Sequence, residues 1–80
     1  MVGATPPEIS DTALLREVRL SPDPIVTATE IADRTGYSRQ AVNYRFQNLV
    51  AGGYLDKREV GARATVYWLT DAGERAMLDG

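Results

Sequence analysis

Apolar residues in the first quarter of the chain recur every three or four positions, which is typical of an amphipathic helix. They predict a first helix that runs to about Leu20, with its apolar side formed by Leu14, Leu15 and Val18. Two candidate N-caps precede it, Thr5 and Ser10, and the sequence leaves the choice between them open. Residues 21–24 read Ser-Pro-Asp-Pro and end the helix, because proline lacks a backbone N–H and restricts the residue before it. Residues 25–26 are then predicted to form a short extended strand.

The next segment carries the signals of two short helices joined by a tight turn. Thr27 and Glu30 have the spacing of a capping box, in which each side chain bonds a free backbone N–H at the start of a helix. Gly36 suits the left-handed conformation that ends a helix, so the second helix is predicted to end just before it. Ser38 then caps a third helix, which is predicted over residues 39–51 and stops at two glycines.

The third helix has an apolar side and a polar side. At about 100° per residue, its apolar stripe is formed by Val42, Phe46 and Leu49. Arg39 and Arg45 flank this stripe. The opposite side is predicted to hold uncharged side chains with amide or phenol groups, namely Gln40, Asn43, Tyr44 and Gln47. Ordinary solvated helix faces favour Lys and Glu, so this face indicates a contact surface.

Two segments of alternating character predict a β-hairpin near the C-terminus. Its strands are expected over residues 54–59 and 64–69, with a four-residue turn at 60–63 that contains a glycine. Thr70 and Asp71 then begin a short final helix. The residues of this helix that are expected to face inward are Ala72, Ala76 and Met77.

Length and composition limit the chain to one small domain. Its 80 residues, 44% of them hydrophobic and 25% charged, are close to globular averages, and we expect residues 1–80 to form a single domain with an ordered core of about 8–78. The chain has no cysteine and no histidine, which excludes disulfides, thiol nucleophiles and the commonest general base and metal ligand. We therefore expect no catalytic residue, no metal and no cofactor, and predict that the protein is not an enzyme.

No segment of the sequence indicates a membrane or an export pathway. No apolar run approaches the roughly 20 residues that cross a bilayer, and the N-terminus lacks the basic and apolar regions of a signal peptide. The expected location is the cytoplasm, without contact with a membrane.

The charges of the chain are unevenly distributed. The formal net charge is −2, yet residues 34–69 hold six basic and two acidic residues, between acidic ends over 1–33 and 70–80. Because the local field steers a ligand to a face, this basic block is compatible with a polyanionic partner. Eight of the nine basic residues are arginine, which with the acidity suits a GC-rich, salt-loving prokaryote, for example a haloarchaeon.

Three segments of the sequence resemble the winged helix-turn-helix domains of prokaryotic regulators of the MarR, ArsR and PadR types. Residues 30–42 fit the pattern E-I-A-x-x-x-G-x-S-x-x-x-V, and residues 49–55 fit L-x-x-x-G-h-h, where h is apolar. Residues 67–73 fit Y-x-L-T-x-x-G, the junction between the hairpin and the last helix. The resemblance implies an α+β fold, mostly helical, in the order helix, short strand, helix, helix, hairpin, helix, with the hairpin as a small antiparallel wing.

The same resemblance implies sequence-specific binding of double-stranded DNA by a transcriptional regulator. The third helix, residues 38–51, is expected in the major groove, and the wing, residues 54–69, on the flanking backbone. Amide side chains match the edge of adenine and arginine matches that of guanine, so base contacts are expected from Gln40, Asn43 and Tyr44. Ser38 and Gln47 belong to the same predicted site as polar groups along this helix. Phosphate contacts are expected mainly from Arg39, Arg45, Lys57, Arg58 and Arg63. Repression is expected over activation, because little outside the DNA-binding domain is left to recruit other proteins.

Several of these residues also have purely structural interpretations. Arg45 is equally suited to cover the edge of the core with its methylene groups. Lys57 and Arg58 are able to pair with the acidic residues that flank them, Asp56 and Glu59, on a solvated hairpin. For these three residues the sequence leaves the role open.

The second strand of the hairpin suggests an alternative function. Tyr67 and Leu69 are expected to face inward, which leaves Val66 and Trp68 in need of cover. The N-terminal helix or the chain ends could cover them, or they could contact a partner in a homodimer or a protein assembly. The alternative to DNA binding is therefore a winged helix that docks proteins through Val66 and Trp68. Neither interpretation brings evidence of a small-molecule effector.

Overall fold

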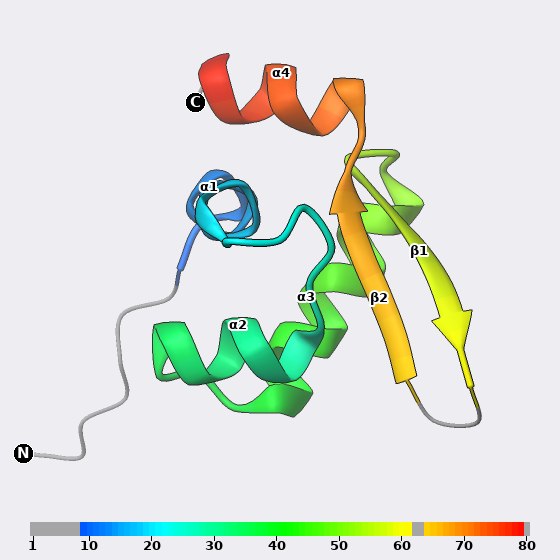
Figure 1. The fold of residues 1–80 in the computed structure, drawn as a ribbon. Helices are drawn as coiled ribbons and strands as arrows, with labels where there is room; N and C mark the ends of the chain where they lie inside the picture. The colour runs from blue at the N-terminus through cyan, green and yellow to red at the C-terminus, as the bar shows by residue number, and fades with distance from the viewer. Residues whose placement is uncertain (1–8, 62–63, 80) are drawn as a thin grey trace, which may run out of the picture.

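The computed structural model describes residues 9–61 and 64–79, which form four helices and one two-stranded antiparallel sheet (Figure 1). This arrangement confirms the predicted α+β winged helix fold. The predicted strand at 25–26 is wrong as a full strand, since only Val26 pairs, through an isolated bridge to Tyr67. The elements are α1 (Asp11–Leu20), α2 (Ala28–Thr35), α3 (Arg39–Ala51), β1 (Leu55–Val60), β2 (Ala64–Leu69) and α4 (Asp71–Asp79).

Side-chain caps set the starts of the first three helices. Ser10 caps α1 by accepting a hydrogen bond from the Ala13 amide at 3.1 Å, whereas Thr5 lies outside the described residues. The capping box of α2 is present: the Thr27 amide donates to Glu30 Oε1 at 2.9 Å, and the Glu30 amide donates to Thr27 Oγ1 at 3.2 Å. These bonds satisfy backbone N–H groups that have no partner inside the helix.

The turn between α2 and α3 also follows the sequence. Gly36 has φ of 81°, in the left-handed region that glycine adopts without steric cost. Ser38 caps α3, its hydroxyl oxygen accepting from the Ala41 amide at 3.0 Å. The predicted ends of both helices are therefore confirmed.

The capping box yields a prediction for stability. Replacing Thr27 with alanine is expected to lower the free energy of unfolding by about 0.5–2 kcal/mol, because the Glu30 amide loses its acceptor. Urea denaturation followed by circular dichroism measures this loss. Thr29→Ala is the matched control, since the exposed Thr29 makes no side-chain hydrogen bond among the described residues. Equal losses in both variants would contradict the prediction.

The register of the hairpin decides which side chains share a face. Leu55 is paired with Leu69 at one end and Val60 with Ala64 at the other. The first strand is thus shifted one residue from the predicted 54–59, and residues 61–63 connect the strands instead of the predicted 60–63. On its other side β2 meets Val26, whose amide and carbonyl both bond Tyr67, at 2.9 and 2.8 Å.

The core lies between α1, α2, α3 and one face of the hairpin. In Figure 1, α1 lies between α4 and α2, and the two strands cover one end of this helical layer. Phe46 is fully buried and meets the ring of Tyr67 edge-on, with centroids 4.8 Å apart. The most buried side chains come from every element except α4: Leu14, Leu15, Val18, Val26, Ile31, Val42, Phe46, Leu49, Leu55 and Tyr67.

The last helix faces the core differently from the prediction. Met77 is buried and Ala76 is half-buried against the core, as predicted, but Ala72 is exposed, so its predicted inward position is wrong. Gly73 is buried in its place. A Cβ atom at Gly73 would run into the backbone carbonyl of Tyr54. This close approach requires glycine at the junction between the wing and α4.

Among the described residues, no helix combines the length and the apolar character that a membrane span requires.

Candidate nucleic-acid interface

The outer side of α3 presents uncharged polar side chains to solvent. Gln40, Tyr44 and Gln47 are all exposed, Tyr44 to 66%. Asn48 is exposed on the same helix and was missed in the sequence analysis, although it lies one turn after Tyr44. The opposite side holds the core, where Val42, Phe46 and Leu49 are buried as predicted. The amide-rich face is therefore open to a partner and is held in place by the core behind it.

Asn43 lies at the edge of this face rather than in its middle. Its side chain is half-buried, and its Oδ1 accepts a hydrogen bond of 3.1 Å from the hydroxyl of Tyr67. The predicted position opposite the apolar stripe is therefore wrong for Asn43, because the tyrosine of β2 lies against this side of the helix. Burial raises the pKa of the Tyr67 hydroxyl, so it stays protonated and able to donate at neutral pH.

The first turn of α3 favours a negatively charged ligand. Among the described helices, α1, α2 and α4 each carry an acidic residue in the first turn, and α3 carries none. Its free backbone N–H groups and helix dipole are thus not neutralised by a carboxylate. Ser38 caps this end and Arg39, exposed, is its first residue. Arg39 is therefore placed where a phosphate would be most favoured.

A polar groove runs from this turn to the start of β2. It brings together three predicted site residues, Arg39, Gln40 and Asn43. The other residues that line it are Thr27, Ala28, Thr29, Ala64, Thr65 and Tyr67. The hydroxyls of Thr29 and Thr65 were missed in the sequence analysis, because neither lies near α3 in the sequence. Thr65 lies two residues before Tyr67 on β2 and therefore shares its face, which was the available signal for Thr65.

Arg45 is held by a carboxylate on the other side of α3. Its Nη2 and Nε both donate to Asp11 Oδ1, at 2.6 and 3.2 Å, and its side chain is only 22% exposed. This pair ties α3 to the first turn of α1. The geometry favours the structural role that the sequence left open for Arg45. In addition to covering the edge of the core, Arg45 forms an ion pair with Asp11.

The two basic residues of β1 lie on opposite faces of the wing. Lys57 is paired with Tyr67, whose ring packs against α3, so Lys57 shares the face toward that helix. Arg58 is paired with Val66 and lies on the other face. The structure thus brings Lys57, and not Arg58, to the side of the wing that faces α3. Arg63 lies outside the described residues.

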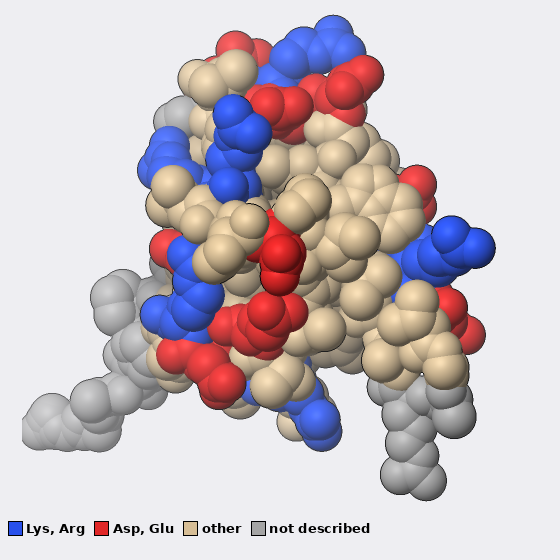
Figure 2. All heavy atoms as spheres, viewed as in Figure 1, with Lys and Arg blue, Asp and Glu red and all other residues tan. Residues whose placement is uncertain are grey.

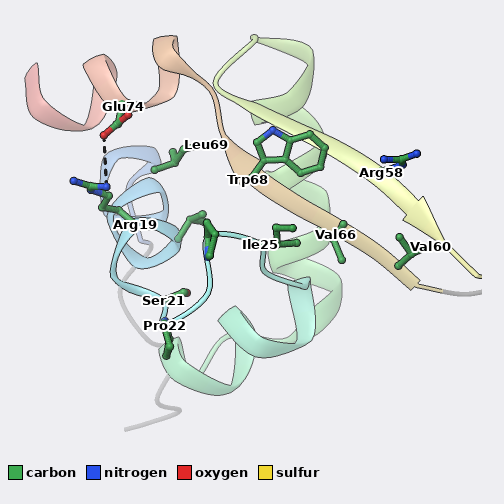
Figure 3. A pocket seen from close by; sticks show the side chains of 12 residues that line it. Arg19, Ser21, Pro22, Ile25, Arg58, Val60, Val66, Trp68, Leu69 and Glu74 are labelled. Atoms are coloured by element: carbon green, nitrogen blue, oxygen red, sulfur yellow. Dashed lines mark ion pairs between the residues drawn. The ribbon is translucent and has the colours of Figure 1, made fainter.

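The face that carries Arg58 forms an apolar groove of about 780 Å³. Figure 3 shows Trp68 and Val66 of β2 facing Ile25, with Arg58 at one end and the Arg19–Glu74 ion pair at the other. Ile25 is 48% exposed, whereas Val66 and Trp68 are half-buried. Figure 2 shows uncharged side chains covering this part of the surface. The segment before α2 therefore covers Val66 and Trp68 in part, and α1 borders the groove through Val18 and Arg19.

Comparison of the sequence with known families identifies the chain. The profile of the MarR family matches residues 3–64. The chain belongs to the MarR family. No curated protein sequence matches it.

Solved structures of MarR-type proteins share the fold. The chain is 27% identical to a MarR family transcription regulator, with a TM-score of 0.73, over 85% of this chain and 45% of that one. The PcaV transcriptional regulator from Streptomyces coelicolor, solved with its natural ligand, is 24% identical with a TM-score of 0.74, over 85% of this chain and 48% of that one. ZitR from Lactococcus lactis, solved in complex with DNA, is 16% identical with a TM-score of 0.68, over 98% of this chain and 54% of that one.

The chain thus spans about half the length of the structures that it matches. The first two of these structures are transcription regulators, and the family assignment agrees with the prediction that the MarR-type chain is not an enzyme. PcaV binds a ligand, so the expected lack of a small-molecule effector stays a prediction here.

Proposed function

We propose that this MarR-family chain binds double-stranded DNA in a sequence-specific manner and regulates transcription. The observation that carries the proposal is the outer side of α3, where Gln40, Tyr44 and Gln47 are exposed while the opposite side is locked into the core. The major groove admits one helix, and its base edges are distinguished by paired donors and acceptors such as amides supply. ZitR, which has the same fold, was solved in complex with DNA, and this supports DNA binding by the present chain.

The positions of the basic residues indicate which of them bind DNA phosphates in this proposal. Arg39 lies at the end of α3 that favours anions, and Lys57 lies on the α3 side of the wing. We assign phosphate contacts to these two, with Ser38 beside them, and retain Arg63 as a prediction. Arg45 is excluded, because Asp11 already neutralises its guanidinium. Arg58 is excluded because it faces the apolar groove.

The proposal includes repression and a two-fold DNA site. A protein seated in the major groove at a promoter blocks the DNA that the polymerase needs. Two copies on a two-fold site place their recognition helices about 34–36 Å apart, one turn of the duplex. Such a protein works in the cytoplasm, where the DNA of a prokaryote lies.

The salt dependence of DNA binding tests the proposal. If three to five phosphates are neutralised, the logarithm of the affinity falls with the logarithm of the salt concentration at a slope of about −3 to −4.5. Arg39→Gln is expected to flatten this slope by about 0.9, because one phosphate contact is lost. Arg45→Gln is the matched control and leaves the slope unchanged. Fluorescence anisotropy with a labelled duplex measures all three proteins, and a flat response of the unaltered protein overturns the proposal.

A second candidate function is the docking of a partner protein on the apolar groove. It is favoured by Ile25 and Val60, which are 48% and 44% exposed beside the half-buried Trp68. Under the DNA-binding proposal, Trp68→Ala leaves the salt slope unchanged. Protein–protein association that Trp68→Ala abolishes and Arg39→Gln leaves intact would favour the second candidate.

A further inference from the structure

The hydrogen bond between Tyr67 and Asn43 bears on which base α3 reads. Tyr67 is only 3% exposed and is held by three contacts. Its backbone bonds Val26, its ring packs on Phe46, and its hydroxyl donates a hydrogen bond to Asn43 of α3. The position of the hydroxyl is therefore set by the core. Asn43, half-buried above it, receives this hydrogen bond at Oδ1, 3.1 Å away.

An asparagine amide that is free to turn offers an acceptor and a donor side by side. This pair matches adenine, which presents N7 as acceptor and the N6 amino group as donor. Here the carbonyl oxygen of Asn43 accepts the hydrogen bond from the Tyr67 hydroxyl, and both side chains line the polar groove. The Tyr67 hydroxyl occupies one lone pair of Oδ1 and holds this oxygen toward Tyr67, so the amino group is the part of the amide that is left to meet a base. Guanine, with two acceptors at O6 and N7, matches donors, whereas the amino group of adenine finds no acceptor.

We propose that Tyr67 is a specificity-determining positioning residue, which holds the amide of Asn43 so that it reads guanine and rejects adenine. This inference rests on the proposed DNA binding and names the base class at one position of the site. It reverses the expectation from the residue type alone, under which Asn43 pairs with adenine.

The geometry also explains why the effect belongs to the hydroxyl and not to the ring. The Tyr67 ring packs against Phe46 at an interplanar angle of 62°, a contact that phenylalanine keeps at this position. Tyr67→Phe therefore preserves the packing and removes only the donor to Asn43. Once released, the amide is free to turn and to pair with adenine through both of its groups.

Binding-site selection from randomised duplexes, at one fixed salt concentration, tests the proposal. Four proteins are compared: the unaltered chain, Tyr67→Phe, Asn43→Ala and Tyr54→Phe. Asn43→Ala identifies the base pair that Asn43 reads, as the one where discrimination is lost. At that pair the unaltered protein is expected to prefer guanine over adenine by on the order of tenfold, and Tyr67→Phe to reduce the ratio at least fivefold or to reverse it.

The controls separate a local from a general effect. Tyr54→Phe removes a phenol from a side chain that is 39% exposed and bonds no side chain among the described residues, so its preference stays that of the unaltered protein. The salt slope of Tyr67→Phe is also unchanged, because no phosphate contact is removed. A merely structural role of Tyr67 would weaken binding to all duplexes equally and leave the guanine preference intact.

Each contrary outcome has a definite meaning. Adenine preferred by the unaltered protein at the Asn43 position, or a preference that Tyr67→Phe does not alter, overturns this inference and leaves DNA binding in place. Failure of the unaltered chain to bind any duplex overturns the proposed function, and this inference with it.

Discussion

Replacing Phe46 with alanine is expected to remove a large part of the free energy of unfolding of the protein. Phe46 is fully buried at the centre of the core, and its ring meets that of Tyr67 at 4.8 Å. Truncation of a buried phenylalanine to alanine costs about 3–5 kcal/mol, because apolar contacts are lost and a cavity remains. A chain of this size has a total stability of roughly 4–12 kcal/mol. Thermal denaturation followed by circular dichroism is expected to show a fall in Tm of more than about 12 °C.

Tyr44 provides the matched control on the same helix. It is also aromatic but is 66% exposed, so Tyr44→Ala is expected to change the stability by no more than about 0.5 kcal/mol. Similar losses in the two variants would show that α3 does not turn Phe46 toward the core and Tyr44 toward solvent. That outcome would also remove the basis for a recognition face on α3.

Replacing Gly73 with alanine is expected to destabilise the protein, although alanine is normally the better helix former. The new Cβ would overlap the carbonyl of Tyr54, and the backbone there is also bonded by the Thr70 amide at 3.2 Å. Helix propensity favours alanine by about 1 kcal/mol. The strain of overpacking this close contact costs about 1–3 kcal/mol, which outweighs the gain in helix propensity. Urea denaturation measures the difference in the free energy of unfolding.

The reverse substitution at the neighbouring residue, alanine to glycine, provides the control. Ala72 is exposed in the same turn of α4, so Ala72→Gly is expected to cost about 0.5–1 kcal/mol through backbone entropy alone. A more stable Gly73→Ala variant would show that the wing and α4 are not in direct backbone contact.

The sequence predicted the features that depend on neighbours along the chain. The capping box of Thr27 and Glu30, the left-handed Gly36 and the Ser38 cap each involve residues within four positions, and all are present. The apolar stripe of α3 was equally predictable, because helical spacing alone defines it. These local signals were sufficient for the helix-turn-helix and for the fold class.

What the sequence missed depends on contacts between distant residues. The side chain of Asn43 is bonded by the hydroxyl of Tyr67, 24 positions away in the sequence. The guanidinium of Arg45 is bonded to the carboxylate of Asp11, 34 positions away. The register of the strands decides that Lys57 and not Arg58 shares the face of Tyr67, because a shift of one residue would reverse every side chain. Ala72 was assigned inward from helical spacing, but the close approach of Tyr54 turns Gly73 to the core instead.

The anchoring of Tyr67 has a consequence for the thermodynamics of association. Through this residue the segment before α2, the wing and α3 are joined at one point, by two backbone hydrogen bonds, a ring contact and a hydroxyl. The surface that they share is thereby preorganised, so a ligand that touches α3 and the base of the wing together does not have to freeze their relative motion. The entropic penalty of complex formation is correspondingly small, and more of the contact energy remains as affinity.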